Sequence, residues 1–219
     1  ESALELKSGE YIFEGLKSFL IKNNMINKDW NALNILIQNA STVGLLDLKI
    51  LSNEKKNDFT FFDNLANKKF KFLYLLGSDN IDLKKDNEFI VYQGSHGDRG
   101  AEIADIVLPS ATYTEQNGLY ENLEGRVQEC KKASYPIGES LEDWKIFNLI
   151  IKKISSKNDQ NNFNQLREEV LQSIPNFNKI NELPKQSEIQ DINTQTSFVS
   201  EEVVVRELDY YYTNFISRS

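Results

Sequence analysis

Two segments near the start of the chain carry apolar residues at three- and four-residue steps, which is the spacing of one helical face. In the first, residues 10–25, the apolar face consists of Tyr11, Ile12, Leu16, Phe19 and Leu20. The second runs from Trp30 to about Val43, with Asp29 placed as its N-cap and Gly44 as its C-cap. The pattern therefore predicts two consecutive helices.

Three short apolar runs follow, and each is bounded by turn residues. They are Lys71–Leu76, Glu88–Tyr92 and Asp105–Leu108, the last ending at Pro109. Short runs of this kind are typical of buried strands, often in a parallel sheet. The stretch 97–104 between the second and third runs has room for one or two helical turns. Strand, turn, short helix and strand together indicate an α/β fold with a largely parallel sheet flanked by helices.

The pattern changes again beyond residue 117. Residues 119–128 read as two short extended segments around a glycine-containing turn, which predicts a small hairpin. A helix is predicted from Trp144 to about Ile154, with its apolar stripe formed by Trp144, Phe147, Ile150 and Ile151. The chain then becomes polar, with a short helix at 165–173. We therefore divide it into an α/β domain, 1–155, and an irregular extension, 156–219, that has a short helix and an aromatic tail.

Composition excludes several classes of site. Lys and Arg number 25 and Asp and Glu number 33, a net charge of −8, which argues against a general nucleic-acid or anionic-membrane surface. The longest apolar runs are about six residues, whereas a membrane helix needs about 20. One Cys and one His are too few for a zinc site, an iron–sulfur cluster or a disulfide formed within the chain.

The glycine-rich segment from Gly94 to Gly100 is one candidate for chemistry. Glycines let main-chain N–H groups approach a phosphate, but the spacing of a dinucleotide or P-loop motif is missing. A tight turn joining a strand to a helix is the favoured interpretation. His96 lies in this segment, and a catalytic role would require a partner such as Cys130 beside it. We expect a locally hydrogen-bonded histidine and an ordinary strand thiol.

Four acidic residues, Asp105, Glu115, Glu121 and Glu124, form a second candidate group. Their spacing does not force any two into one site, so we expect them to be solvated or ion-paired. Arg126 is placed to pair with one of them in bidentate fashion.

The C-terminal tail holds a run of adjacent aromatic residues. Three adjacent aromatics cannot all face one core, so at least one must find another surface. Docking onto a partner and packing across the back of the domain are both open. The docking candidates are Tyr210, Tyr211, Tyr212 and Phe215.

The stretch Val91–Ala133 resembles molybdopterin oxidoreductase-type domains. The motifs that carry the resemblance are Ala104–Pro109, Tyr113–Gly118 and Asn122–Gln128. Within that superfamily the chain is most similar to the largest iron–sulfur subunit of respiratory complex I. That similarity rests on Tyr92-Gln93-Gly94, His96-Gly97-Asp98, Glu142–Ile146, Asp29-Trp30 and Phe215–Ser219.

The resemblance implies that this chain is only the C-terminal part of that subunit, as a fragment or a split-gene product. In the family this part has the molybdopterin-enzyme fold without a molybdenum cofactor. Positions matching active molybdenum enzymes are Asp105, Glu115, Asn122, Glu124, Gly125 and Arg126, and we expect a buried Glu124–Arg126 or Asp105–Arg126 network among them. The residues expected to hold the fold are Gly94, His96, Asp98, Gly100, Asp105, Pro109, Glu115, Gly118, Asn122, Glu124, Gly125 and Arg126.

The resemblance further implies a non-catalytic structural role in the NADH-oxidising peripheral arm, with no redox centre in this chain. Iron–sulfur clusters and FMN belong to neighbouring parts, and the expected partners are other complex I subunits, above all the cluster-bearing N-terminal half. Low Arg content, five of the 25 basic residues, accompanies AT-rich coding and, together with the family's habits, favours a mitochondrial protein. The resemblance implies that it lies on the matrix face of the inner membrane. The cytoplasmic face of a bacterial inner membrane is the alternative. The rival functions are the cofactor-binding part of a split molybdenum or pterin oxidoreductase and a free-standing binding module.

Overall fold

The computed structural model of the chain describes residues 6–27, 29–37, 41–50, 64–78, 83–155, 162–184 and 197–202. Its helices are α1 (Gly9–Lys22), α2 (Ser41–Asp47), α4 (Arg99–Glu102), α5 (Asp143–Ile154) and α6 (Phe163–Ser173), with the 3-10 turn η1 (Pro175–Asn178). Its strands are β1 (Phe72–Leu76), β2 (Phe89–Gly94), β3 (Ile106–Pro109), β4 (Gly118–Glu121) and β5 (Val127–Cys130). The docking candidates Tyr210–Tyr212 and Phe215 lie outside the described residues.

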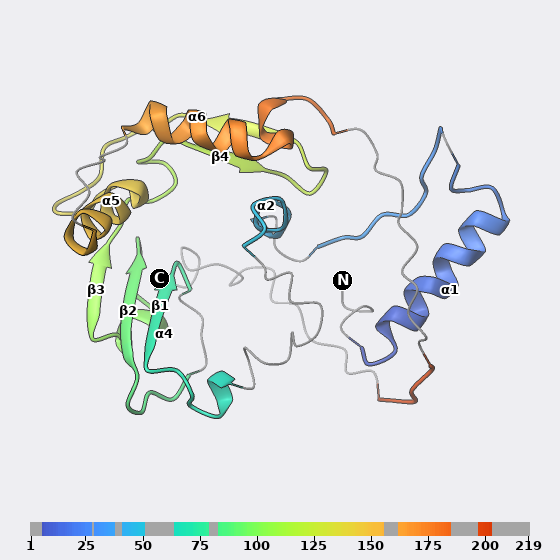
Figure 1. Cartoon of the computed structure of the whole chain (residues 1–219), viewed down its shortest axis with the longest axis horizontal. Coiled ribbons are helices and arrows are strands. Elements are labelled where there is room, and N and C mark those ends of the chain that lie inside the picture. Colours follow the sequence, from blue (N-terminus) through green and yellow to red (C-terminus); the bar gives the residue numbers. More distant parts are fainter. Residues whose placement is uncertain are drawn as a thin grey trace.

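The central feature is a parallel three-stranded sheet in the order β1-β2-β3. Val91 of β2 pairs with Tyr74 on one side and with Ile106 on the other. All three strands point their carboxyl ends toward α5 and the β4-β5 hairpin (Figure 1). The predicted α/β fold with a parallel sheet and a small antiparallel pair is confirmed.

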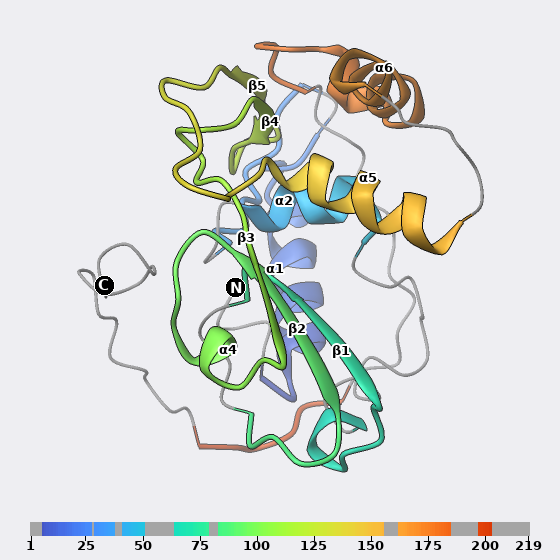
Figure 2. The same cartoon turned by 90° about the vertical axis from the view of Figure 1, so that its left-hand side faces the viewer.

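The core lies against one face of this sheet. Leu73, Leu75, Ile90 and Tyr92 form its buried centre. Partly buried residues from the flanking segments close it: Leu65, Phe70, Leu83, Ala101, Ile103 and Ala104. The last three come from α4 and the turn after it, so the short helix between β2 and β3 covers the sheet (Figure 2).

The prediction of a helix from Trp30 to Val43 is wrong over residues 31–37, and the predicted C-cap Gly44 lies inside α2. Residues 31–37 are not helical, and α2 begins only at Ser41. The Asn27 side chain accepts hydrogen bonds from the main-chain N–H groups of Asp29 and Trp30, each at 2.9 Å. That Asx-type turn, with an Ile26–Asn31 bridge, supplies non-helical partners for the backbone.

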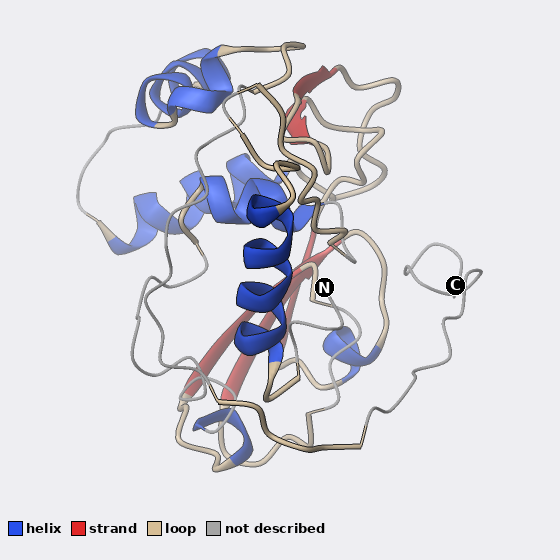
Figure 3. Ribbon diagram, turned by 90° about the vertical axis from the view of Figure 1, so that its right-hand side faces the viewer, coloured by secondary structure: helices blue, strands red, loops and turns tan. Residues whose placement is uncertain are grey.

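The first predicted helix is confirmed as α1, but its apolar face is only slightly covered. Leu20 is buried, whereas Phe19 and Leu16 remain 59% and 46% exposed. The helix lies at the end of the molecule away from the sheet (Figures 1 and 3). The α5 stripe also differs from its prediction, because Ile146 is buried and Ile151 is half-exposed. None of the helices in the described part of the chain combines the length and apolarity that a membrane crossing requires.

Candidate functional site

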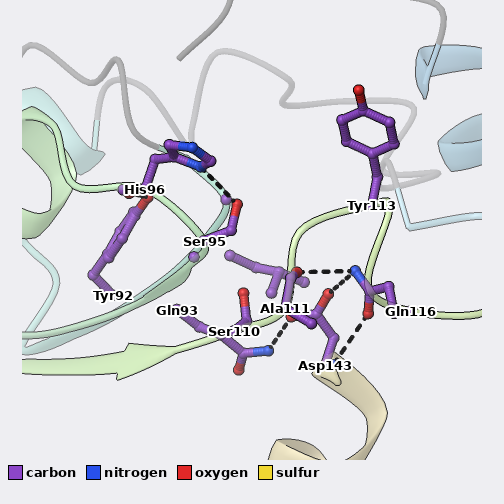
Figure 4. Close-up of a pocket in the computed structure, with 12 residues that line it drawn as sticks. Tyr92, Gln93, Ser95, His96, Ser110, Ala111, Tyr113, Gln116 and Asp143 are labelled. Atoms are coloured by element: carbon purple, nitrogen blue, oxygen red, sulfur yellow. Dashed lines mark hydrogen bonds between the residues drawn. The ribbon is translucent and has the colours of Figure 1, made fainter. Parts of the chain in front are cut away.

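A cavity of about 210 Å³ lies at the carboxyl ends of the parallel strands. This edge of an open α/β sheet is where ligands usually bind. The walls come from the ends of β1 and β2, the segment after β3 and the first residue of α5 (Figure 4). The lining residues that carry polar side chains are Tyr92, Gln93, Ser95, His96, Ser110, Tyr113, Gln116 and Asp143.

The polar groups on the floor of this cavity bind one another. Gln93 is fully buried, and its Nε2 donates to Asp143 Oδ1 at 2.6 Å while Tyr74 donates its hydroxyl to Gln93 Oε1. Gln116 donates from Nε2 to Asp143 Oδ2 at 3.0 Å and to the carbonyl of Ala111 at 3.3 Å. Burial, and then the negative charge of Asp143, raises the pKa of Tyr74. Both oxygens of Asp143 are therefore engaged by amides of the same chain.

The glycine-rich segment borders the cavity and joins β2 to α4. A Cβ added at Gly94 would lie 2.3 Å from the Tyr92 hydroxyl, and one at Gly100 would lie 2.5 Å from the main-chain oxygen of Ser78. The Tyr92 hydroxyl donates to the carbonyl of His96 at 2.6 Å. The absence of a side chain at both glycines therefore leaves space for the Tyr92 ring.

Within that segment the polar side chains contact their sequence neighbours. Ser95 Oγ lies 3.1 Å from His96 Nδ1, and Asp98 caps α4 by accepting from the N–H of Arg99. Cys130 lines a different cavity, of about 300 Å³, between the hairpin and α6. The structure therefore does not bring His96 and Cys130 into one cavity.

Asp105 holds the start of β3 to β2. Its Oδ2 accepts from the N–H of Ile90 at 2.8 Å, and Lys85 donates to Oδ1 at 2.5 Å. The hydrogen bond from Lys85, followed by that from Ile90, lowers the pKa of Asp105. An Asp105–Arg126 pair was predicted, and the structure contradicts it.

The hairpin turn is organised by Asn122 instead of by an ion pair. Its Oδ1 accepts from the N–H groups of Glu124 and Arg126, both at 3.0 Å. Gly125 has φ of +77°, a conformation that favours glycine. Glu124 is exposed, no ion pair among the described residues includes Arg126, and Arg126 Nε is buried without a partner there. The predicted Glu124–Arg126 network is therefore wrong as well.

Three predicted positions make local contacts. Pro109 ends β3, and its carbonyl accepts from the N–H of Leu141 at 3.2 Å. Glu115 accepts from the N–H of Thr112 at 3.2 Å. Gly118 begins β4, opposite Cys130.

Sequence reasoning missed Glu142, which precedes α5 and is 4% exposed. Its carboxylate accepts from Trp144 Nε1 at 3.0 Å and lies 3.1 Å from Lys145 Nζ and 3.5 Å from Lys132 Nζ. Burial alone would raise the pKa of Glu142, but the hydrogen bonds from Trp144 and Lys145 and the nearby ammonium charges outweigh it and lower the pKa. The motif Glu-Asp-Trp-Lys contained this signal, since it places an acid beside an indole N–H and a base.

Glu121 was also misjudged, because it is 9% exposed and not solvated. It lies in β4 beside Asp47 of α2, and Asn176 of η1 donates from Nδ2 to both carboxylates. Burial, followed by repulsion from Asp47, raises the pKa of Glu121 to about 7. The sequence carried no signal for this group, because its members are more than fifty residues apart.

Comparison with known proteins defines the class. The family model for molybdopterin oxidoreductase matches residues 1–153, and the chain belongs to this family. The parallel sheet and the strand-end cavity both fall inside that match.

Three relatives illustrate the similarity. The 75 kDa subunit of NADH-ubiquinone oxidoreductase from Reclinomonas americana is 35% identical over 99% of this chain and 31% of its own length. The mitochondrial 78 kDa subunit from Candida albicans is 36% identical over 98% of the chain and 30% of its own. A subunit of the NADH-quinone oxidoreductase of Rickettsia typhi is 37% identical over 90% of the chain and 28% of its own. The chain thus spans about 30% of the length of these relatives.

Proposed function

We propose that this chain is a structural, non-catalytic part of the peripheral arm of respiratory complex I. The observation that carries the proposal is the similarity of 35–36% identity over nearly the whole chain to the 75 and 78 kDa subunits. The remaining length of those relatives supplies the expected partner, the cluster-bearing half of the same subunit. The expected site is the matrix face of the mitochondrial inner membrane, or the cytoplasmic face of a bacterial one.

Two physical arguments support a role without a redox centre. An iron–sulfur cluster takes about four Cys ligands, and the whole sequence has one Cys and one His. Within the described residues, no three His, Cys, Asp or Glu side chains are grouped so that they could hold a metal. In the strand-end cavity, Gln93, Gln116 and Asp143 bind one another and so stabilise the fold.

A native gel of gently solubilised source membranes tests membership of the complex. The chain is detected with an antibody, and a parallel lane is stained for NADH dehydrogenase activity. We expect the chain to co-migrate with a very large NADH-oxidising band. Membranes treated with urea before the gel are the control, in which the chain must migrate as a small species. Small, free migration without urea would overturn the proposal.

The second candidate is the cofactor-binding part of a split molybdenum or pterin oxidoreductase, and the position of the strand-end cavity favours it. Elemental and pterin analysis of the purified complex separates the two. We expect iron from neighbouring parts but neither molybdenum, tungsten nor pterin in proportion to this chain. The second candidate would be established if the purified complex held molybdenum or pterin in proportion to this chain and the Gln93→Leu variant did not.

A further inference from the structure

One edge of the parallel sheet, strand β3, exposes apolar side chains on both of its faces. Within the described part of the chain β3 pairs only with β2, and it is the outermost strand in Figure 1. Ile106 and Val107 point to opposite faces of the sheet and are 45% and 49% exposed. Val91 of β2, which has a strand on each side, is only 7% exposed. β3 therefore has the composition of an inner strand at the position of an edge strand.

The outer side of β3 also presents main-chain hydrogen-bonding groups. Ser110 donates its N–H to the last residue of β2 at 3.0 Å. On either side of Ser110, the carbonyl of Pro109 accepts from the N–H of Leu141 at 3.2 Å, and Ala111 donates to the Leu141 carbonyl at 2.8 Å. Alternate residues of a strand direct these groups to the same side. Val107 therefore directs its N–H and C=O away from β2, where the described residues place no strand beside it.

This edge carries no charge that would discourage pairing. Edge strands are commonly protected by Lys, by Pro or by a covering segment. Asp105, just before β3, already binds Lys85 and the N–H of Ile90. Residues 106–108 are all apolar, and Pro109 lies at the end that Leu141 bridges. The edge beside Val107 is thus open to another strand.

An apolar groove adjoins the same edge. Its volume is about 350 Å³, and Leu108 and Pro109 of β3 form one wall. The two charged residues of its lining, Glu139 and Lys153, have opposite signs, so the groove favours apolar side chains over a charge of either sign. The opposite wall is apolar and consists of Leu141, Leu149, Ile150 and Ile154.

We propose that the outer edge of β3 and this groove bind an extended apolar segment of the same subunit, from the part that lies outside this chain, as a fourth strand. The inference rests on the proposed function and names the surface through which the partner binds. The Reclinomonas americana relative, which matches 99% of this chain, is covered over only 31% of its own length, so such a subunit has further chain to supply the strand. Main-chain hydrogen bonds to Val107 supply affinity, and the groove selects alternate apolar side chains of the segment.

Amide hydrogen exchange of the complex from gently solubilised source membranes tests the pairing. Exchange at Val107 is measured by mass spectrometry at single-residue resolution, in the complex and in the free 219-residue chain. We expect it to be slower in the complex by about 100-fold or more. Equal exchange in a chain that co-migrates with the NADH-oxidising band would overturn this inference and leave the proposed function intact.

Two variants of Val107 separate the hydrogen bond from the side chain. Val107→Pro removes the outward N–H and keeps the ladder to β2, as Pro can at an edge. Val107→Ala shortens the same side chain and keeps the N–H. Expressed in the source cells, Val107→Pro should enter the very large band about tenfold less than wild type, and Val107→Ala less than about twofold less. Circular dichroism and the Tm of the free chains show that both variants fold.

A second pair of variants keeps the test decisive if Val107→Pro fails to fold. Ile106→Lys places a charge on the exposed edge, and Leu16→Lys changes an equally exposed residue of α1. We expect only Ile106→Lys to stay out of the complex. Incorporation of a folded Val107→Pro or Ile106→Lys chain at the wild-type level would overturn the inference. A free chain that is a dimer by light scattering, with a protected Val107 amide, would assign the edge to a second copy and overturn the choice of partner.

Discussion

Glu142 offers the sharpest test of how this fold is held together. Replacing it with alanine removes the carboxylate whose Oε2 accepts from Trp144 Nε1 and whose Oε1 pairs with Lys145 Nζ and Lys132 Nζ. Its side chain is 5% exposed, whereas those of Lys145 and Lys132 are 44% and 31% exposed. The indole donor consequently loses its partner in a partly buried place, and the two ammonium groups can turn to water.

The magnitude follows from these exposures. A hydrogen bond to a charged group contributes about 1.5–3 kcal/mol, and each partly exposed ion pair contributes about 0.5 kcal/mol. We expect Glu142→Ala to lower the free energy of unfolding by about 3 kcal/mol, or the Tm by roughly 6–12 °C in a chain of this size. Glu142→Gln keeps an acceptor for Trp144 and loses only the charge, so it should cost about 1–1.5 kcal/mol.

The pH dependence gives an independent check. Because the folded-state pKa of Glu142 is lowered, its contribution is present above the unfolded pKa of about 4.3 and is lost as pH falls through the folded value. Urea unfolding followed by tryptophan fluorescence between about pH 3 and 7 measures it. Glu129→Ala, which breaks one exposed pair with Arg167, is the control and should change the free energy of unfolding far less than Glu142→Ala. Equal losses for Glu142→Ala and Glu129→Ala, or an unchanged pH profile in Glu142→Gln, would refute the reasoning.

Three further predictions concern other parts of the fold. Gly100→Ala places a Cβ 2.5 Å from the Ser78 main-chain oxygen and should lower the free energy of unfolding by about 1–3 kcal/mol. Gly15→Ala in α1, whose Cβ would have no atom within 4 Å, should instead raise that free energy by about 0.5–1 kcal/mol. Chemical denaturation of the two variants measures both changes. Asn122→Ala frees two main-chain N–H groups of the hairpin turn and should cost about 2 kcal/mol, and an unchanged urea midpoint would contradict that role for the side chain. The folded pKa of Glu121 is raised, so its stabilising effect is full below about pH 4.5 and is lost as pH rises through about 7. The urea midpoint should therefore fall over that range in wild type and stay level in Glu121→Gln.

The sheet and its neighbours could be predicted because their signals are local. Each strand is a short apolar run that ends at turn residues, and the runs at 71–76, 88–92 and 105–108 coincide with β1, β2 and β3 within two residues. The hairpin and α5 were likewise readable from a glycine turn and an apolar stripe. The failed helix at Trp30 shows the limit, since apolar spacing cannot reveal that Asn27 binds the next main-chain N–H groups.

Ion pairs were the least predictable part of the candidate site. Arg126 is close in sequence to Glu124, yet their side chains do not pair. The main-chain N–H groups of both residues instead donate to Asn122 Oδ1, which fixes the turn. Asp105 finds Lys85, twenty residues away, because a parallel connection brings the loop before β2 next to the start of β3. Such partners depend on the register of strands, and register is a long-range property.

The sequence by itself determined the α/β class, the succession of the strands, the family and the absence of enough Cys and His for a cluster. These follow from periodicity, turn chemistry and composition, which act over a few residues or over the whole chain. Only the tertiary structure decided that Gln93, Asp143 and Gln116 bind one another, and that Asp47, Glu121 and Asn176 meet. The physical reason is that burial and charge pairing depend on which distant segments the folded chain places side by side.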